Sequence, residues 1–596
     1  MNAALSLLSA ALLILTFPKA NQTWLAPFAL APLLYALGRE PRPLRRFLLG
    51  WGAGILYWFG VCYWIQGTLQ HYGDMGVFGS WGAFLLFCLI KALHLGLFSL
   101  LAAVLLPTWY AIPAIAALWV GIERTHGMFG FAWLCLGNAG IDMALPMRLS
   151  PFTGVYGLSF VFLLMSVGSA VVILRRARKE LLWLLPTLAL FLLPGLPDPQ
   201  PGDQTAVLVQ GNVSEDQDWT PLAVEQMRQS LVTLSLEQSL GNHPRLIVWP
   251  ESPGPIYYYR DPALRQSVTD LVHLTGAWLL FGTVAETPQG KPLNSAVLLD
   301  PAGRLVDRYD KVNLVPFGEY VPKLFDFVNR ITKEAGDFSP GSRLVVFPIG
   351  GGHTLSTFIC YESVFPSDVR QFARQGAELL VNISNDGYFG GSAAREQHLE
   401  IVRMRAAENR RWLLRATNDG ITVSIDPAGR IQDKLVSFRK TAGRFNFAFE
   451  PGITTYTERG DWFAWICLAL ADCCVAITVI AKTRPGASRT SWFRFAKRPA
   501  GSTSPLNRAS QPTPNAPTGS PGVAWLCFVR RPKKAQNVDS STDQKCPRMP
   551  PQAPIGAPGA KNVVVLIGNS PPTAGNGWPI NLPEPSYGEG PSCAAV

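Results

Sequence analysis

The chain has 596 residues, of which 48% are hydrophobic and only 16% are charged, and it carries 18 tryptophans and a net charge of +11. This length exceeds what a single hydrophobic core normally supports, so several domains are expected. The balance of apolar over charged residues is that of a membrane protein. A nucleic-acid binder is disfavoured, because the basic residues gather in short clusters beside apolar runs, which is typical of membrane topology signals.

Residues 1–200 are almost continuous apolar segments and predict a helical membrane domain of about seven spans, with one further apolar run much later in the chain. The first 18 residues admit a second interpretation as a cleaved signal peptide, although they lack a basic start and a clear small-residue cleavage site. Judged by the ~20-residue length that crosses a bilayer, the expected spans are 4–18, 23–38, 46–67, 77–106, 108–123, 153–174, 181–197 and 462–481.

Clusters of Lys and Arg predict the orientation of these spans. With eight spans, three clusters fall on one face, and the positive-inside tendency makes that face cytoplasmic. They are Arg39, Arg42, Arg45 and Arg46 after the second span, Arg175, Arg176, Arg178 and Lys179 after the sixth, and Lys482, Arg484, Arg489, Arg494, Lys497 and Arg498 after the eighth. The long stretch between spans seven and eight then lies on the opposite, outward side.

Residues 204–450 are interpreted as one α/β domain, because short β-rich runs alternate with helical patterns. The helical patterns start at Pro221, at Asp261 followed by proline, and near Ala393, and we expect these helices to cover the sheets. The strand-like runs are "TAVLVQGN", "RLIVWPES", "WLLFGTV", "SAVLLD", "RLVVFPI", "HTLSTFICYES" and "ELLVNISND".

The basic tail at 484–596 differs in composition from the rest of the chain. It is rich in Pro, Ser and Gly, and such a segment cannot bury enough apolar surface to order itself. We expect it to be a disordered cytoplasmic extension.

A lone cysteine at the end of a strand-like run is the first candidate for chemistry. Cys360 is the only one of ten cysteines that falls within the α/β domain, and a buried small hydrophobe is its ordinary interpretation. A nucleophilic cysteine also needs a group that accepts its proton and a group that stabilises the charge on the substrate. Glu251 and Lys311, at the ends of two other runs, have these chemistries, since a carboxylate can act as general base and an ammonium supplies a fixed positive charge.

The segments around these three residues carry a family resemblance. Glu251 in "VWPES", Lys311 in "YDKVNLVPFGEYVP" and Cys360 in "ICYES" resemble the Glu-Lys-Cys triad of the nitrilase, or carbon–nitrogen hydrolase, superfamily. With the upstream spans and the "NISNDGYFG" stretch, residues 1–482 are similar to the apolipoprotein N-acyltransferase family of bacterial inner membranes. The resemblance implies a nitrilase-like α-β-β-α sandwich in the periplasm, attached to an α-helical membrane domain.

The resemblance also implies a two-step acyl transfer that uses no metal or diffusible cofactor. Cys360 would take an acyl chain from the sn-1 ester of a phospholipid, typically phosphatidylethanolamine, as a thioester, with Glu251 as base and acid and Lys311 as oxyanion partner. The α-amine of the diacylglyceryl-cysteine of an apolipoprotein would then receive the chain, in the last step of lipoprotein maturation. A monomer is expected, with no nucleic acid partner. His353 and His398 are too isolated to predict a metal site.

Four further positions match the family more weakly. Glu319 in "FGEYVP" matches a glutamate near the lysine, although a structural ion pair explains it equally well. Tyr361 and Glu362 match positions that support the nucleophile, but the alternation of a strand lets only one of them share the side of Cys360 unless the chain turns. Trp219 corresponds to a tryptophan at the lipid entrance, with ordinary packing as the alternative.

Two other functions remain open. A membrane-tethered amidase or nitrilase that hydrolyses a small C–N bond would share the triad, but it would have no use for the preceding spans. A transporter or receptor would need intramembrane charges along a pathway, and few are present. An acyltransferase must also meet its lipid, so an apolar loop from 204–450 or from 125–152 is expected to contact the bilayer, and the candidates are 325–338 and 127–137.

Overall fold

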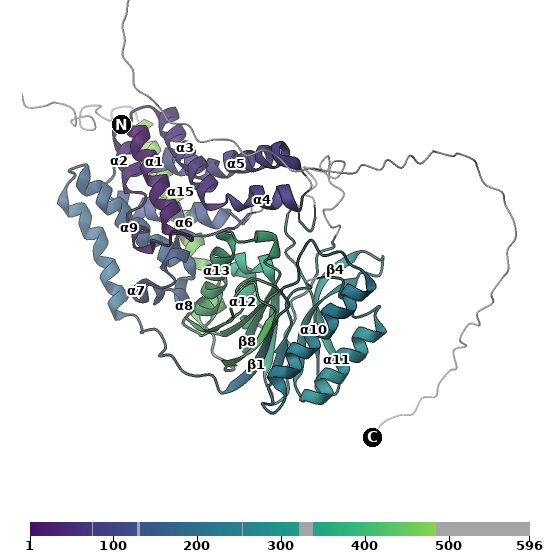
Figure 1. Ribbon diagram of the computed structural model, residues 1–596. Coiled ribbons are helices and arrows are strands. Elements are labelled where there is room, and N and C mark those ends of the chain that lie inside the picture. The colour runs from purple at the N-terminus through teal and green to yellow at the C-terminus, as the bar shows by residue number, and fades with distance from the viewer. Residues whose placement is uncertain (74, 128–130, 253, 317, 321–337, 484–596) are drawn as a thin grey trace, which may run out of the picture. The chain divides into compact units, whose positions relative to one another are not determined.

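The computed structural model describes residues 1–73, 75–127, 131–252, 254–316, 318–320 and 338–483. Figure 1 shows a bundle of helices from the first part of the chain and two β-sheets flanked by helices from the second part. The expected combination of a helical membrane part and an α-β-β-α sandwich is confirmed. The expected tail at 484–596 lies outside the described residues.

Three of the described helices are long and apolar enough to cross a membrane, namely α5 (Gly76–Leu105), α9 (Val155–Ile173) and α15 (Trp462–Thr483). A fourth crossing results if α3 (Pro43–Val61) and α4 (Trp64–His71), which meet at 59°, count as one bent span. The expected number of eight spans stays a prediction. The shorter helices of this part are α1 (Asn2–Thr16), α2 (Ala31–Arg39), α6 (Ala111–Thr125), α7 (Ala144–Met147) and α8 (Ser150–Thr153).

Two expected spans differ from uniform helices. The segment expected at 23–38 contains a short 3-10 turn, η1 (Thr23–Leu25), followed by α2. The segment expected at 181–197 forms a 3-10 helix, η3 (Arg178–Leu192), with Pro186 inside it. Proline has no backbone N–H, so Pro186 interrupts the hydrogen-bond pattern of this segment.

The last helix, α15, returns to the N-terminal helices. In Figure 1 the yellow-green α15 lies among the purple helices. A Cβ at Gly121 of α6 would meet Leu468 of α15 at 2.9 Å, so glycine allows this close approach. The hydroxyls of Tyr110 and Thr478, 2.8 Å apart, add a hydrogen bond between the same two regions. Chain segments on both sides of residues 204–450 therefore belong to one bundle.

Two six-stranded sheets form the centre of the α/β part, in the orders β12-β1-β2-β3-β4-β5 and β11-β10-β9-β8-β7-β6. The strands of the first sheet are β1 (Gln204–Gln210), β2 (Leu246–Val248), β3 (Trp278–Glu286), β4 (Pro292–Leu299), β5 (Leu305–Asp310) and β12 (Thr441–Phe447). Those of the second are β6 (Phe347–Pro348), β7 (Thr354–Ile359), β8 (Leu379–Ser384), β9 (Trp412–Thr417), β10 (Val423–Ile425) and β11 (Ile431–Lys434).

The strands divide their side chains between two cores, because successive residues point to opposite faces. In β1, Val207 and Val209 pack with the helices α10 and α11, whereas Ala206 and Leu208 join the core shared with the second sheet. The second sheet is covered by α12 and α13 (Figure 1). These helices are α10 (Pro221–Ser239), α11 (Pro262–Thr275), α12 (Pro366–Arg374) and α13 (Ala394–Asn409), followed by the short α14 (Thr455–Arg459).

The start of α11 confirms the cap predicted from the Asp-Pro pair. The side chain of Asp261 accepts hydrogen bonds from the backbone N–H groups of Ala263 and Leu264, at 2.9 and 3.1 Å. These contacts satisfy N–H groups that the first helical turn leaves without partners.

Residues 131–137 connect the membrane helices to α13. The indole Nε1 of Trp133 donates to Oε1 of Gln397 at 2.8 Å, and Nε2 of Gln397 donates to the carbonyls of Pro18 and Val61, both at 3.1 Å. Trp133 and Leu136 are buried and pack inside the protein. Residues 128–130 of this segment lie outside the described residues, so the expected bilayer contact at 127–137 stays a prediction. Within the other expected contact, at 325–338, residues 325–337 lie outside the described residues.

Candidate active site

Three strand ends bring the expected triad together. Glu251 follows β2, Lys311 follows β5 and Cys360 follows β7, so two members come from the first sheet and one from the second. Nζ of Lys311 lies 3.3 Å from Oε1 of Glu251, and the charges of both groups act on the thiol of Cys360. The exposed fractions are only 8% for Glu251, 1% for Lys311 and 8% for Cys360, so the three groups share a site that is largely shielded from water.

Two carboxylates and an amide enclose the ammonium group of Lys311. Its Nζ also donates to Oε1 of Glu319 at 2.9 Å, and Nδ2 of Asn294 donates to both Glu251 and Glu319 at 2.7 Å. Burial alone would lower the pKa of Lys311, but the two carboxylates raise it, and the pKa lies well above its ordinary value. Lys311 is therefore a permanent cation in this site.

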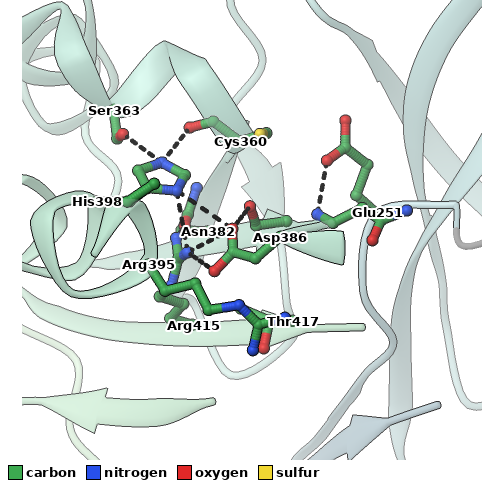
Figure 2. A network of polar contacts seen from close by, with 12 residues as sticks. Glu251, Cys360, Ser363, Asn382, Asp386, Arg395, His398, Arg415 and Thr417 are labelled. Carbon is green, nitrogen blue, oxygen red and sulfur yellow. Dashed lines mark hydrogen bonds and ion pairs between the residues drawn. The ribbon is translucent and has the colours of Figure 1, made fainter. Parts of the chain in front are cut away.

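The second oxygen of Glu251 is held by the other sheet. The backbone N–H of Asn385, just after β8, donates to Oε2 of Glu251 at 2.8 Å (Figure 2). The turn at Glu251 also lies close to β3, where a Cβ at Gly282 would meet the backbone nitrogen of Ser252 at 2.6 Å. Both oxygens of Glu251 thus have protein partners that fix the direction of the carboxylate.

The backbone turns sharply at Cys360. β7 ends at Ile359, and Cys360 begins the short 3-10 helix η6 (Cys360–Val364) with a φ of +50°. The expected single strand through "ICYES" is therefore wrong beyond Ile359. Burial raises the pKa of the Cys360 thiol, Glu251 raises it further, and Lys311 lowers it. The net direction is upward, so the resting thiol keeps its proton and needs a base to become a nucleophile.

Glu362 ties this turn to the segment after β5. Its Oε2 accepts from the backbone N–H of Ile359 at 2.8 Å, and its Oε1 accepts from the hydroxyl of Tyr309 at 2.7 Å and from the N–H groups of Val312 and Asn313 at 2.7 and 3.1 Å. Burial raises the pKa of Glu362, and these hydrogen bonds oppose that shift. Glu362 thus joins the turn that carries Cys360 to the segment that follows Lys311.

Tyr361 points to different neighbours, because the chain turns before it. Its ring lies 5.4 Å from that of Phe365 and 6.4 Å from that of Phe131, between ring centroids. A hydrogen bond to the backbone of Ala132 opposes the upward shift that burial imposes on the pKa of Tyr361. The turn at Cys360 thus lets Tyr361 contact the membrane part while Glu362 supports the catalytic part.

Trp219 lies beside the turn that carries Glu251. Its side chain is 37% exposed, and a Cβ at Gly254 would meet its indole ring at 2.2 Å. Glu215, on the same loop, was not anticipated from the sequence. Burial raises the pKa of Glu215 to about 7, against hydrogen bonds from Asn385 and Tyr388. The loop therefore brings an aromatic surface and a carboxyl that titrates near neutral pH to the edge of the site.

The structure adds Asn294 to the candidate residues, and it shows a contact to Glu251 from Asn385, whose segment 385–390 has lining of the site as its second interpretation. The only sequence signal for Asn385 is the Asn-Asp-Gly turn that follows a strand, and a turn residue alone does not predict a contact with Glu251. Asn294 lies inside β4 and has no such signal. Among the described residues, no group of three or more His, Cys, Asp or Glu side chains is arranged to hold a metal ion.

Comparison with known proteins gives matches along both parts of the chain. The profile of the apolipoprotein N-acyltransferase N-terminal domain matches residues 9–168, and that of the carbon-nitrogen hydrolase family matches residues 206–441. An apolipoprotein N-acyltransferase of Geobacter metallireducens is 34% identical over 504 residues, which cover 80% of this chain and 95% of that protein. Another, of Vibrio vulnificus, is 30% identical and covers 76% of this chain and 92% of its own length.

Two solved structures, an amidase and a member of the nitrilase superfamily, match part of the chain. An amidase from Nesterenkonia covers 44% of this chain and 94% of its own, with 20% identity and a TM-score of 0.31. A member of the nitrilase superfamily from Saccharomyces cerevisiae matches over 42% of this chain and 93% of the yeast chain, with 18% identity and a TM-score of 0.33. The extent of the match to the Geobacter protein, together with the two adjoining profiles, shows that the chain belongs to the apolipoprotein N-acyltransferase family.

Proposed function

We propose that this protein transfers an acyl chain from a phospholipid, through a thioester on Cys360, to the α-amine of the N-terminal diacylglyceryl-cysteine of an apolipoprotein. Membership of the family supports the reaction. The observation that carries the assignment of residues is the burial of Glu251, Lys311 and Cys360 at three strand ends, with Lys311 Nζ 3.3 Å from Glu251 Oε1. Phosphatidylethanolamine as donor and a monomeric enzyme are part of this proposal.

In the first half-reaction Glu251 takes the proton from the Cys360 thiol, and Sγ attacks the sn-1 ester carbonyl of the phospholipid. The carbonyl oxygen becomes an oxyanion, which the ammonium of Lys311 stabilises. The ester C–O bond then breaks, and Glu251 gives its proton to the departing glycerol oxygen. The products are the acyl thioester and a lysophospholipid.

In the second half-reaction the neutral α-amine of the acceptor attacks the thioester carbonyl. Glu251 removes a proton from the attacking nitrogen, and Lys311 again faces the oxyanion. The C–S bond breaks, and the sulfur recovers the proton from Glu251, so that an amide is formed and the enzyme returns to its resting state. Glu251 alternates between base and acid in both halves, which suits a carboxylate whose two oxygens are held in place.

Incubation with phospholipid alone, followed by mass spectrometry of the intact protein, tests the proposal. A mass increase of one acyl chain on Cys360, reversed by neutral hydroxylamine, is expected because no acceptor amine is present. An amidase or nitrilase would instead hydrolyse a small amide and leave the lipid untouched. A protein that stays unmodified in phospholipid vesicles while cleaving small C–N bonds would overturn the assignment.

Lys311→Met should lower the acylation rate by about 10²–10³-fold, by analogy with the loss of oxyanion donors. The change also leaves Glu251 and Glu319 without their shared cation, and breaking such a buried pair typically costs about 3–5 kcal/mol of stability. The double variant Lys311→Met/Glu319→Gln removes one of the two carboxylates and should recover part of this stability. Thermal unfolding and acylation rates measured on both variants would separate the two effects, and recovery of activity along with stability would contradict an oxyanion role.

The basic clusters support a further proposal, that residues 204–450 face the periplasm of an inner-membrane protein and that the tail is cytoplasmic. A reporter that is active only after export should be active when fused after residue 300 and inactive when fused near residue 490. A cytoplasmic reporter at the same two positions is the matched control and should give the opposite result. Finding both fusion points on one side of the membrane would break the eight-span arrangement.

A further inference from the structure

A buried histidine lies beneath the nucleophile. His398, on α13, is 0% exposed, and its Nε2 lies 3.1 Å from the carbonyl oxygen of Cys360 and 2.9 Å from Oγ of Ser363 (Figure 2). On the other side of the ring, Nδ1 lies 3.2 Å from Oδ1 of Asp386 and 3.1 Å from Nη2 of Arg415. The imidazole therefore separates the backbone of the nucleophile from a buried ion pair.

The contact to Cys360 places a proton on Nε2 of His398. A carbonyl oxygen only accepts hydrogen bonds, so the contact to Cys360 requires a proton on Nε2. Nδ1 lies between the guanidinium of Arg415, which only donates, and the carboxylate of Asp386, which only accepts, so these two partners do not decide whether Nδ1 is protonated. Burial and the charge of Arg415 lower the pKa of His398, which agrees with a neutral ring whose single proton is on Nε2.

A rigid set of buried groups fixes the orientation of this ring. Asp386 accepts from Nη2 of Arg415 at 2.7 Å and from the hydroxyl of Ser384 at 2.8 Å. Arg415 also donates to the side chain of Asn382, which in turn donates to the carbonyl of Phe358 at 3.1 Å, within the strand that leads to the nucleophile. Burial would raise the pKa of Asp386, but Arg415 holds it well below its ordinary value, so the ion pair stays charged.

Within this network, Cys360 has the backbone conformation that most needs support. Its φ of +50° lies in the left-handed region, which non-glycine residues keep only when their surroundings hold them there. From these contacts we infer that His398 is a positioning residue for acyl transfer, whose Nε2–H holds the carbonyl of Cys360 and thereby aims Sγ at the substrate carbonyl. This inference rests on the proposed function of Cys360 as the nucleophile.

The inference predicts an effect on the chemical step and little effect on lipid binding. Rotation of the backbone at Cys360 swings Sγ directly, whereas Glu251 and Lys311 follow strands of the first sheet. Displacement of a reacting atom by about 1 Å can cost on the order of 10²-fold in rate. The side chain of His398 is fully buried and is not exposed to a bound lipid, so the affinity for phospholipid should depend on it only weakly.

The test compares variants of the full-length protein in detergent. His398→Leu removes the donor and keeps a similar volume, whereas His398→Gln retains an N–H donor near the place of Nε2. Asn409→Ala is the matched control, because it deletes two buried hydrogen bonds at the far end of α13, to the carbonyl of Arg405 and from the hydroxyl of Thr457, both at 2.9 Å. Thioester formation from phospholipid is followed by mass spectrometry over a range of lipid concentrations, with thermal unfolding measured in parallel.

We expect His398→Leu to lower kcat for acylation by about 10–100-fold. KM should change by less than about threefold, because the lost hydrogen bond positions the nucleophile and does not contact the lipid. His398→Gln should recover most of kcat. Asn409→Ala should lower the unfolding temperature by a similar amount while keeping kcat. If His398→Leu does not fold, His398→Asn gives the same comparison, since its amide reaches Asp386 but is too short for the Cys360 carbonyl.

Two results would overturn the positioning role. One is an unchanged kcat in the Leu or Asn variant. The other is a loss of kcat that follows the unfolding temperature equally in the Leu, Gln and Asn409 variants, which would make His398 a stabilising residue only. If the unaltered protein forms no thioester on Cys360, the proposed function fails instead, and this outcome is distinct from both.

Discussion

Cys360→Ala is expected to abolish thioester formation and acyl transfer, with a loss of at least about 10⁴-fold, because removal of the nucleophile leaves no atom that can carry the acyl chain. The fold should remain intact. The side chain loses only its sulfur, and the backbone contacts of Cys360 to His398 do not involve Sγ. Mass spectrometry for the acyl adduct and transfer to a diacylglyceryl peptide are the two measurements.

The buried Cys88 offers a matched control, because Cys88→Ala makes the same chemical change in α5, within the membrane part. That variant should keep its activity. A Cys360→Ala protein that still transfers acyl chains at the normal rate would eliminate the thioester mechanism. The cysteine would then be a small hydrophobic residue at a strand end, which is the ordinary interpretation of its sequence position.

Glu251→Gln is expected to lower the acylation rate by about 10²–10⁴-fold, the range typical for loss of a general base. The amide oxygen can still accept the hydrogen bond from Asn385, and Lys311 keeps its ion pair with Glu319. The amide nitrogen then faces two other donors, Lys311 and Asn294, so the variant should fold with reduced stability. The same change removes a negative charge that raises the pKa of the Cys360 thiol, while the lowering effect of Lys311 remains. The thiol pKa should therefore fall in this variant.

In Glu251→Gln, the reactivity of the thiol and the rate of acylation are therefore expected to change in opposite directions. Alkylation of Cys360 by iodoacetamide depends on the thiolate, so its pH profile should shift to lower pH in Glu251→Gln even though acylation by phospholipid is slower. Glu400→Gln, a buried glutamate on α13 whose charged neighbours are Arg403, Asp142 and Glu396, is the control and should change neither rate. If the variant loses alkylation and acylation together, the loss reflects misfolding and not removal of a base.

The candidate triad was named from the sequence because each member follows a strand-like segment and the flanking motifs resemble those of a known family. The same reasoning could not place Asn294, which lies within β4 with no turn beside it, or His398, which lies within a helix. Their contacts join strands and helices that are far apart in the chain. Periodicity reports which face of an element is apolar, but it carries no information about which polar groups of two different elements meet.

The turn at Cys360 also could not be predicted from the sequence. A positive φ is usually marked by Gly or Asn, and "TFICYES" contains neither. Apolar length likewise predicted a helical span at 181–197, where Pro186 lies within a 3-10 helix. Trp133 is of a residue type that is common at membrane interfaces, but its side chain is buried and contacts α13. In each case a tertiary contact or a missing N–H decided the conformation over the local pattern.

The return of α15 to the helical bundle fastens the catalytic part at both of its chain ends, since α9 precedes it and α15 follows it. A domain connected to the bundle at one end only would sample a wide volume. A domain connected at both ends to the same bundle keeps a narrow range of distances from the bilayer. If Cys360 takes its acyl chain from a phospholipid, as proposed, it meets that donor at an effective concentration set by the composition of the surrounding bilayer. The quantity that governs its supply is the mole fraction of the donor among neighbouring lipids, and diluting the whole membrane suspension leaves that quantity unchanged.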